Sequence, residues 1–472
     1  MTFSSRRRKT HQVQITFSDE KVTSFGGMIL EHRLASRLGL WTMLEKRLPS
    51  RDGQYSWMDI IQSGIAGLLS GARGTFATQA LRDDQALLEL LDLEGAPEEA
   101  TFWRCLEGLG RMTDDGVLGR VQADWTRTIL GRLKRPDLLE CDGFFPIFAD
   151  GTLLEGSLKR EGTKTIKDKG NGLLWGTIFA GPLVASQGLA KAGQGEQTLI
   201  RRQLPEVVGR ILKPLKLVKK SLLLADALHG NEPTLKIVEQ HKLSYIVGAG
   251  ALVRATETLQ AQPESQWHEL GTEPKRGWER QAVCQCWFQG EDWTHKRLLI
   301  GRRVVREGEM FPTYYGVLTN LTSETLGASD TASFARAVWR LYDAKGRMEL
   351  NYKELLSDLN LHHPPCREHV RNAGFYGLAT LAHTLGVGVK LIGESGNSET
   401  RHKKAKATRD GMPERIRIKP GRGMRLWRVR RTLLTLPARV SRHARRLGLE
   451  LLGVSAGVRE LFERWYGAIA RC

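Results

Sequence analysis

The stretch that decides the fold is FFPIFAD at residues 144–150, together with SLLLAD at residues 221–226. Each is a short apolar run that ends in an aspartate, a pattern typical of a buried β-strand with a carboxylate at its C-terminal end. An amphipathic segment at residues 197–213, QTLIRRQLPEVVGRILK, lies between them and predicts a helix. Alternating strands and helices predict an α/β sheet, in which strand-end side chains open onto one edge.

The pattern continues on both sides of these two strands. Strand candidates occupy residues 173–181 and 244–250, and PLVAS at 182–186 either extends the first of these or forms a third strand. Residues 252–321 are β-rich, and helical spacing returns over residues 333–359. We therefore expect an α/β core made of residues 136–251 and 322–395, interrupted by a β-rich insertion at 252–321.

The two ends of the chain differ from this core. Residues 1–20 are expected to form a flexible arm that carries a basic cluster of Arg6, Arg7, Arg8 and Lys9. Residues 21–135 repeat apolar positions at helical spacing and predict a helical N-terminal domain, which becomes a candidate DNA-binding domain if the partner is nucleic acid. Residues 396–472 form a basic C-terminal segment, or tail.

Charge identifies the class of partner. The chain has 472 residues, a formal net charge of +19 and a pI of about 9.8. Residues 401–472 hold twenty Lys/Arg against five Asp/Glu, a net of +15, so the remaining 400 residues carry only about +4. A basic balance of this size favours polyanions, nucleic acid first. A solvated tail without a partner is the alternative interpretation of the C-terminal charge.

Other features exclude several classes of protein. The six cysteines form no CxxC pair, which argues against a zinc ribbon or a disulfide scaffold and fits a reduced cytoplasm. The apolar stretch at residues 373–393 contains His383 and Lys390, so we expect a buried helix and no membrane span. No glycine-rich phosphate loop occurs, and no nucleotide cofactor is expected.

Three carboxylates are the candidates for chemistry. Asp150 and Asp226 end the two buried strands, and Glu349 lies within the helix predicted at residues 333–359. Two strand-end aspartates can share hard cations, and a carboxylate from a packed helix can complete a two-metal site for phosphoryl transfer. Taken singly, each aspartate could be a turn former or a helix cap, and the glutamate a surface residue.

The residues around Glu349 resemble the Tyr-x2-Arg-x3-Glu-x6-Lys signature of bacterial insertion-sequence DDE transposases. Tyr342, Lys345 and Glu349 fill its first three positions, and Leu356 stands where the family has lysine. Lys353, one turn after Glu349, can take the role of that lysine. Positions 342, 345, 349 and 353 share one helical face, where tyrosine and lysine can hold the DNA backbone.

The resemblance extends in patches over about residues 17–395, including FADGTLLEG and LLLADALHGNE around the two aspartates. It implies a ribonuclease H-like catalytic core and a DNA transposase that cuts insertion-sequence ends and joins them to target DNA. It further implies two Mg²⁺ or Mn²⁺ ions held by Asp150, Asp226 and Glu349. Transposon ends and target DNA would be the partners of a homodimer, in the cytoplasm at the bacterial nucleoid.

Several alternatives remain open at this stage. The chain could be a ribonuclease H-like nuclease without strand transfer, or a non-catalytic DNA-binding relic of a transposase. His229, three residues after Asp226, is a further candidate for a contact at the site. The LHHPPCREH segment at residues 361–369 could bind a metal, but its two prolines prevent regular helical ligand spacing.

Overall fold

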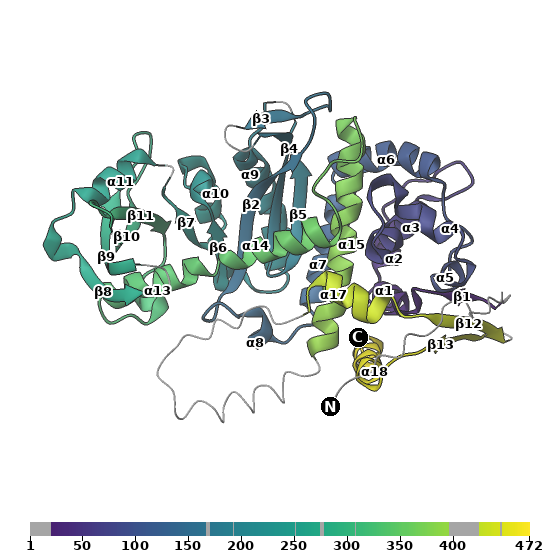
Figure 1. The fold of residues 1–472 in the computed structure, drawn as a ribbon. Coiled ribbons are helices and arrows are strands. Elements are labelled where there is room, and N and C mark those ends of the chain that lie inside the picture. The colour runs from purple at the N-terminus through teal and green to yellow at the C-terminus, as the bar shows by residue number, and fades with distance from the viewer. Residues whose placement is uncertain are drawn as a thin grey trace, which may run out of the picture.

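A computed structural model describes residues 20–166, 170–191, 193–250, 252–273, 278–306, 308–395, 424–443 and 446–472. The basic cluster of Arg6, Arg7, Arg8 and Lys9, a candidate for contacts with nucleic acid, lies outside these ranges. A mixed β-sheet forms the middle of the molecule, with a β-rich extension on one side and a helical domain on the other (Figure 1). The long helix α15 (His369–Ser395) stands between the sheet and the helical domain (Figure 1).

Three parallel strands form the centre of the sheet: β2 (Phe145–Glu155), β6 (Ser221–Ala225) and β7 (Ser244–Gly248). All five residues of β6 are buried, as expected for a parallel strand covered on both faces. Beyond β2 the sheet continues through antiparallel partners, which are β4 (Gly170–Ala180), β3 (Lys164–Ile166) and β5 (Leu183–Leu189). The segment PLVAS therefore begins a separate strand.

The connections between these strands are helical. Helix α9 (Glu196–Val207), with a π-helical end at Val208–Leu212, links β5 to β6, and α10 (Glu232–Gln240) links β6 to β7. Asn231 caps α10 by accepting a hydrogen bond from the backbone N–H of Thr234 at 3.2 Å. The helix predicted over residues 333–359 is in three parts: α13 (Thr331–Asp343), α14 (Gly346–Lys353) and a π-helical segment, Glu354–Asp358.

The segment expected as a β-rich insertion holds α11 (Val253–Gln260), β8 (His268–Glu273), β9 (Trp278–Phe288), β10 (Arg297–Arg306) and β11 (Thr313–Thr319). Its last strand pairs with the core, because β11 lies antiparallel to β7 with Val317 opposite Gly248. The strand order is β3-β4-β2-β6-β7-β11-β10-β9-β8, so the insertion lengthens the core sheet instead of forming a sheet of its own.

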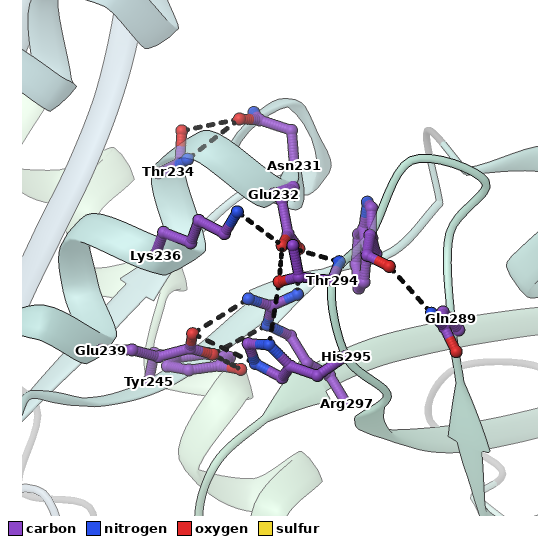
Figure 2. Close-up of polar contacts among 11 residues, drawn as sticks. Asn231, Glu232, Thr234, Lys236, Glu239, Tyr245, Gln289, Thr294, His295 and Arg297 are labelled. Carbon is purple, nitrogen blue, oxygen red and sulfur yellow. Dashed lines mark hydrogen bonds and ion pairs between the residues drawn. The ribbon is translucent and has the colours of Figure 1, made fainter.

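A buried arginine fixes this extension to the core (Figure 2). Arg297, 3% exposed at the start of β10, donates from Nε and Nη2 to the carboxylate of Glu239 at 2.8 and 2.9 Å and also pairs with Glu232. Burial acts to raise the pKa of Glu232, but hydrogen bonds from Thr294 and Arg297 outweigh it and lower this pKa to about 2. Both carboxylates lie on α10, the helix that follows Asp226 in the chain.

Replacing Arg297 with alanine should destabilise the protein by about 3–5 kcal/mol, because the carboxylates of Glu232 and Glu239 lose their buried cationic partner. Chemical denaturation measures this loss. Arg303→Ala, on the same strand, is the matched control: Arg303 pairs with Glu264, whose side chain is 75% exposed, and a smaller loss is expected. Equal losses for the two variants would contradict the assigned anchoring role.

The helical domain comprises α1 (Ile29–Arg37), α2 (Leu40–Glu45), α3 (Trp57–Ser70), α4 (Gln79–Arg82), α5 (Gln85–Leu90), α6 (Glu99–Asp114) and α7 (Val117–Leu130). A capping box begins α3, where Ser56 and Asp59 bond each other's backbone N–H. Helix α6 touches α15 backbone to backbone, since a Cβ added at Gly110 would lie 1.8 Å from the carbonyl oxygen of Val370. Glycine at this crossing lets the helical domain pack directly onto the core.

Helix α15 is long and apolar enough to cross a membrane, and it alone passes that test among the described residues. The protein covers 94% of its most apolar window, which is the burial of a core helix. Lys390, near its C-terminal end, is buried and donates to both carboxylate oxygens of Glu354 at 2.9 and 3.1 Å. The helix therefore packs as the sequence predicted for residues 373–393.

The described part of the basic C-terminal segment is folded. It contains α17 (Leu426–Val429), a π-helical segment (Arg430–Leu434), β12 (Ala438–His443), β13 (Arg446–Leu451) and α18 (Ala456–Ala470). The short strand β1 (Val22–Thr23) pairs with β12, so the two ends of the described chain share a three-stranded sheet. Trp465 of α18, 1% exposed, packs against Gly393 of α15. This segment is part of the core and not only a carrier of charge.

Candidate active site

The two aspartates are neighbours because of strand register. Ala149 of β2 pairs with Ala225 of β6 in a parallel ladder, and Asp150 and Asp226 are the next residues along the chain. Asp226 follows the end of β6, but β2 continues to Glu155 by pairing with β4, so the prediction that Asp150 ends its strand is wrong. Adjacent strands in a sheet lie about 4.8 Å apart, so this register places both carboxylates together where β6 ends. Asp226 also caps the 3₁₀ turn that follows it, accepting from the backbone N–H of Leu228 at 3.0 Å.

Two further side chains complete the group. Ligand atoms of Asp150, Glu196, Asp226 and His229 all lie within 4.8 Å of one another. Glu196 is the first residue of α9, and its carboxylate is 2.8 Å from Nε2 of His229, which is fully buried. The same Nε2 lies 3.9 Å from Oδ1 of Asp226. The site thus contains three carboxylates and one imidazole, which lies beside the carboxylates of Glu196 and Asp226.

Close packing holds this group in place. A Cβ added at Gly151 would lie 2.5 Å from Oε2 of Glu196, so glycine lets α9 approach the strand here. The backbone N–H of Gly151 donates to Oδ1 of Asp150 at 2.9 Å. From the other side, the buried hydroxyl of Tyr352 on α14 donates to the carbonyl oxygen of Asp150 at 2.9 Å. Helix α14 is therefore fixed directly against the strand that carries Asp150.

The electrostatics of the site favour a cation. Burial, followed by the negative charges of Glu196 and Asp226, raises the pKa of Asp150 to about 7. Burial also acts to raise the pKa of Glu196, but the hydrogen bond and charge of His229 outweigh it and lower that pKa. Carboxylates this close repel one another unless a proton or a cation neutralises them. An oxygen-rich set of this kind fits a hard divalent ion such as Mg²⁺ or Mn²⁺.

The helix residues from the signature take different places. Burial, followed by the charges of Asp226 and Asp150, raises the pKa of Tyr342 to about 12, so its hydroxyl faces the site. The positive charge of Lys345 acts to lower the pKa of Asp150. Lys353 and Glu349 are exposed, and Glu349 is not one of the four clustered residues.

Glu196 was not predicted from the sequence, and His229 was only a candidate contact. A signal for Glu196 exists in the topology. Because β5 runs antiparallel to β4, it ends at the same edge as β2, and α9 begins there before returning to the start of β6. An acidic residue in the first turn of a helix that begins there is brought close to Asp150 and Asp226.

Comparison with known proteins gives one family. Residues 189–409 match the model described as "Transposase DDE domain group 1", a range that includes Asp226 and Glu349 and begins after Asp150. A similar solved structure is a piggyBac transposase synaptic complex with hairpin DNA, at 13% identity and a TM-score of 0.39 over 89% of this chain and 83% of that one. The search of curated proteins finds no match.

Residues 189–409 of this chain match the DDE domain of transposases. The resemblance to DDE transposases drawn from the sequence is confirmed over this range, and so is the α/β fold with a mixed sheet. The cluster around Asp150 and Asp226 lies at the carboxyl end of β6, with Asp150 on the neighbouring strand β2. Sites in α/β sheets form at the carboxyl ends of parallel strands.

Proposed function

We propose that the protein is a DNA transposase that cleaves insertion-sequence ends and joins them to target DNA, acting as a homodimer on DNA at the nucleoid in the cytoplasm. The observation that carries the proposal is the proximity of Asp150 and Asp226 on adjacent parallel strands, with Asp226 inside the range that matches the DDE domain. Asp150, Asp226 and Glu349 would hold two Mg²⁺ or Mn²⁺ ions. Bound ions of this kind supply Lewis-acid activation of the attacking and leaving oxygens.

The choice of Glu349 as third carboxylate is supported by its helix face. Lys345, the residue before α14, and Glu349 and Tyr352 within it are spaced by four and three residues, a helical spacing that places them on one side of this helix. Tyr352 bonds the backbone of Asp150, and Lys345 acts on the carboxylate of Asp150. Exposure of Glu349 fits a ligand at the mouth of a site that must admit DNA.

The remaining residues have roles in holding DNA and shaping the site. Lys345 and Lys353 would contact phosphates, and Tyr342 would donate to the backbone near the reacting bond. Arg6, Arg7, Arg8 and Lys9 would add phosphate contacts that carry no sequence information. Glu196 and His229 bond each other and form the wall behind the two aspartates. No nucleotide cofactor has a role in this scheme.

Strand transfer from pre-cut ends tests the proposal. Duplexes that carry the element's own terminal sequence with a free 3′-hydroxyl should be joined to a plasmid in Mg²⁺ or Mn²⁺. Glu349→Gln should reduce joining by about 10²–10³-fold, the scale of losing one group that stabilises developing charge. Cleavage without joining would indicate a nuclease. The absence of both reactions would indicate a DNA-binding relic. A Glu349→Gln variant with full activity would remove Glu349 from the site.

A further inference from the structure

A cluster of basic side chains lies at the edge of the sheet opposite the candidate active site. Its members come from two segments of the chain, one that precedes β2 and one that precedes β6. We call six of these residues the rear basic surface: Arg132, Arg135, Lys213, Lys216, Lys219 and Lys220. All six side chains are exposed. None of the six forms an ion pair with any residue in the described parts of the chain.

The two segments form one surface. Arg135, at the start of α8 (Arg135–Leu138), donates from Nη2 to the backbone carbonyl of Lys216 at 3.3 Å. A Cβ added at Gly131 would lie 3.6 Å from Cδ2 of Leu215. Lys216 has a positive φ of 55°, which turns the chain at this point, and Lys219 and Lys220 follow in the 3₁₀ turn before β6. The positive charges are therefore neighbours in space and not only in sequence.

This concentration of charge stands out against the rest of the protein body. Of the 71 Lys/Arg, twenty lie in residues 401–472 and four in residues 1–10, which leaves 47 for residues 11–400. Of the 52 Asp/Glu, five lie in residues 401–472 and none in residues 1–10, which also leaves 47. Residues 11–400 thus carry equal numbers of positive and negative side chains. The surplus of positive charge at the rear basic surface is therefore a local feature of that surface.

The rear basic surface and the catalytic group lie toward opposite ends of the core strands. Strands β2 and β6 are parallel, so their first residues lie at one end of the core strands, and Asp150 and Asp226 lie toward the other end. From Lys220 to Asp226 the chain advances six residues, about 20 Å at 3.3 Å per strand residue. The interior of the sheet lies between the two edges, and all five residues of β6 are buried in it.

We propose that the rear basic surface binds the phosphate backbone of a second DNA segment, separate from the one held at Asp150 and Asp226. Its chemistry suits this partner, because lysines and arginines without carboxylate partners bind phosphates and release condensed counterions. The inference rests on the proposed function for the nature of its partner. A reaction that joins one DNA to another must hold more than one segment, and this surface supplies a place away from the chemistry.

Salt-dependent binding of a fluorescent random-sequence duplex to the full chain, in EDTA, tests the proposal. The cluster variant carries Lys213→Glu, Lys216→Glu, Lys219→Glu and Lys220→Glu. The matched control makes the same change in net charge at four exposed positions elsewhere: Lys46→Glu, Arg104→Glu, Lys242→Glu and Lys296→Glu. Between about 50 and 200 mM salt, each lost phosphate contact should reduce the slope of log affinity against log salt by about 0.9.

The cluster variant should therefore lose up to about 3.6 from the slope, and the control clearly less. Unchanged circular dichroism and thermal unfolding would show that both variants fold. Equal slopes for the two variants, or no duplex binding by the unchanged protein, would overturn the proposal. EDTA removes divalent ions, so binding is measured without cleavage. If the cluster variant and the control had the same slope while the unchanged protein still performed strand transfer, the rear basic surface alone would be rejected. If the slopes differed but the unchanged protein performed no strand transfer, the transposase function alone would be rejected.

Discussion

Asp150→Ala and Asp226→Ala should each abolish metal-dependent DNA cleavage while leaving DNA affinity close to that of the unchanged protein. The two carboxylates occupy equivalent positions on paired parallel strands, and neither can take over the ligand atoms of the other. Removing one leaves an incomplete cation site, and a loss of about 10²–10³-fold or more is expected. The assay is cleavage of a plasmid that carries the element with its flanking DNA, in Mg²⁺.

Stability gives an independent sign of the same site. Asp150 is held among negative charges that raise its pKa to about 7, so Asp150→Ala should not destabilise the metal-free fold and relieves repulsion there. Asp52→Ala, at an exposed position in the helical domain, is the control and should cleave normally. Wild-type cleavage by Asp150→Ala or by Asp226→Ala would remove that residue from the catalytic group.

Ending the chain after residue 423 should prevent folding, which is the second large effect. This truncation removes the buried side chains Leu426, Val429, Leu433, Leu434, Trp465 and Ile469. Each large apolar side chain contributes about 1.5–3 kcal/mol on burial. Their sum, about 9–18 kcal/mol, is comparable with the net stability of a typical domain, about 5–15 kcal/mol. Soluble yield and thermal unfolding of the truncated chain measure the effect.

Two tryptophans of the same segment give a graded form of this test. Trp465→Ala should cost about 3–5 kcal/mol, because the side chain is 1% exposed against α15. Trp427→Ala is the matched control, since this side chain is 42% exposed, and should cost much less. A soluble truncated chain with an unchanged unfolding temperature would show that the packing of residues 424–472 contributes nothing to the fold.

The core could be predicted because its signals are local. FFPIFAD and SLLLAD are short apolar runs that suit buried strands, and a parallel register then brings their terminal aspartates together. The helix break near Gly346 was not predicted, although glycine in a helix interior is unfavourable by about 0.5–1 kcal/mol. Glu196 escaped prediction because its position depends on the direction of β5, which its own sequence does not reveal.

The C-terminal segment shows how charge can hide packing. Twenty Lys/Arg in residues 401–472 predicted a basic tail, but Leu426, Val429 and Leu433 recur at helical spacing and are buried. Arg430, in the same segment, donates to the carbonyl oxygens of Leu69 and Asp358 at 2.8 and 2.6 Å. Part of the positive charge therefore serves the fold, a use that composition cannot distinguish from DNA binding.

The most direct test of the central claim is the anomalous scattering of Mn²⁺ in crystals of the protein bound to DNA. Mn²⁺ takes the oxygen ligands that suit Mg²⁺, whose metal–oxygen distances are about 2.0–2.1 Å. The account predicts anomalous peaks at the carboxylates of Asp150 and Asp226, with Glu349 contributing a further oxygen. Peaks elsewhere, or Glu349 more than about 10 Å from both aspartates and so too far to share a metal pair, would contradict it.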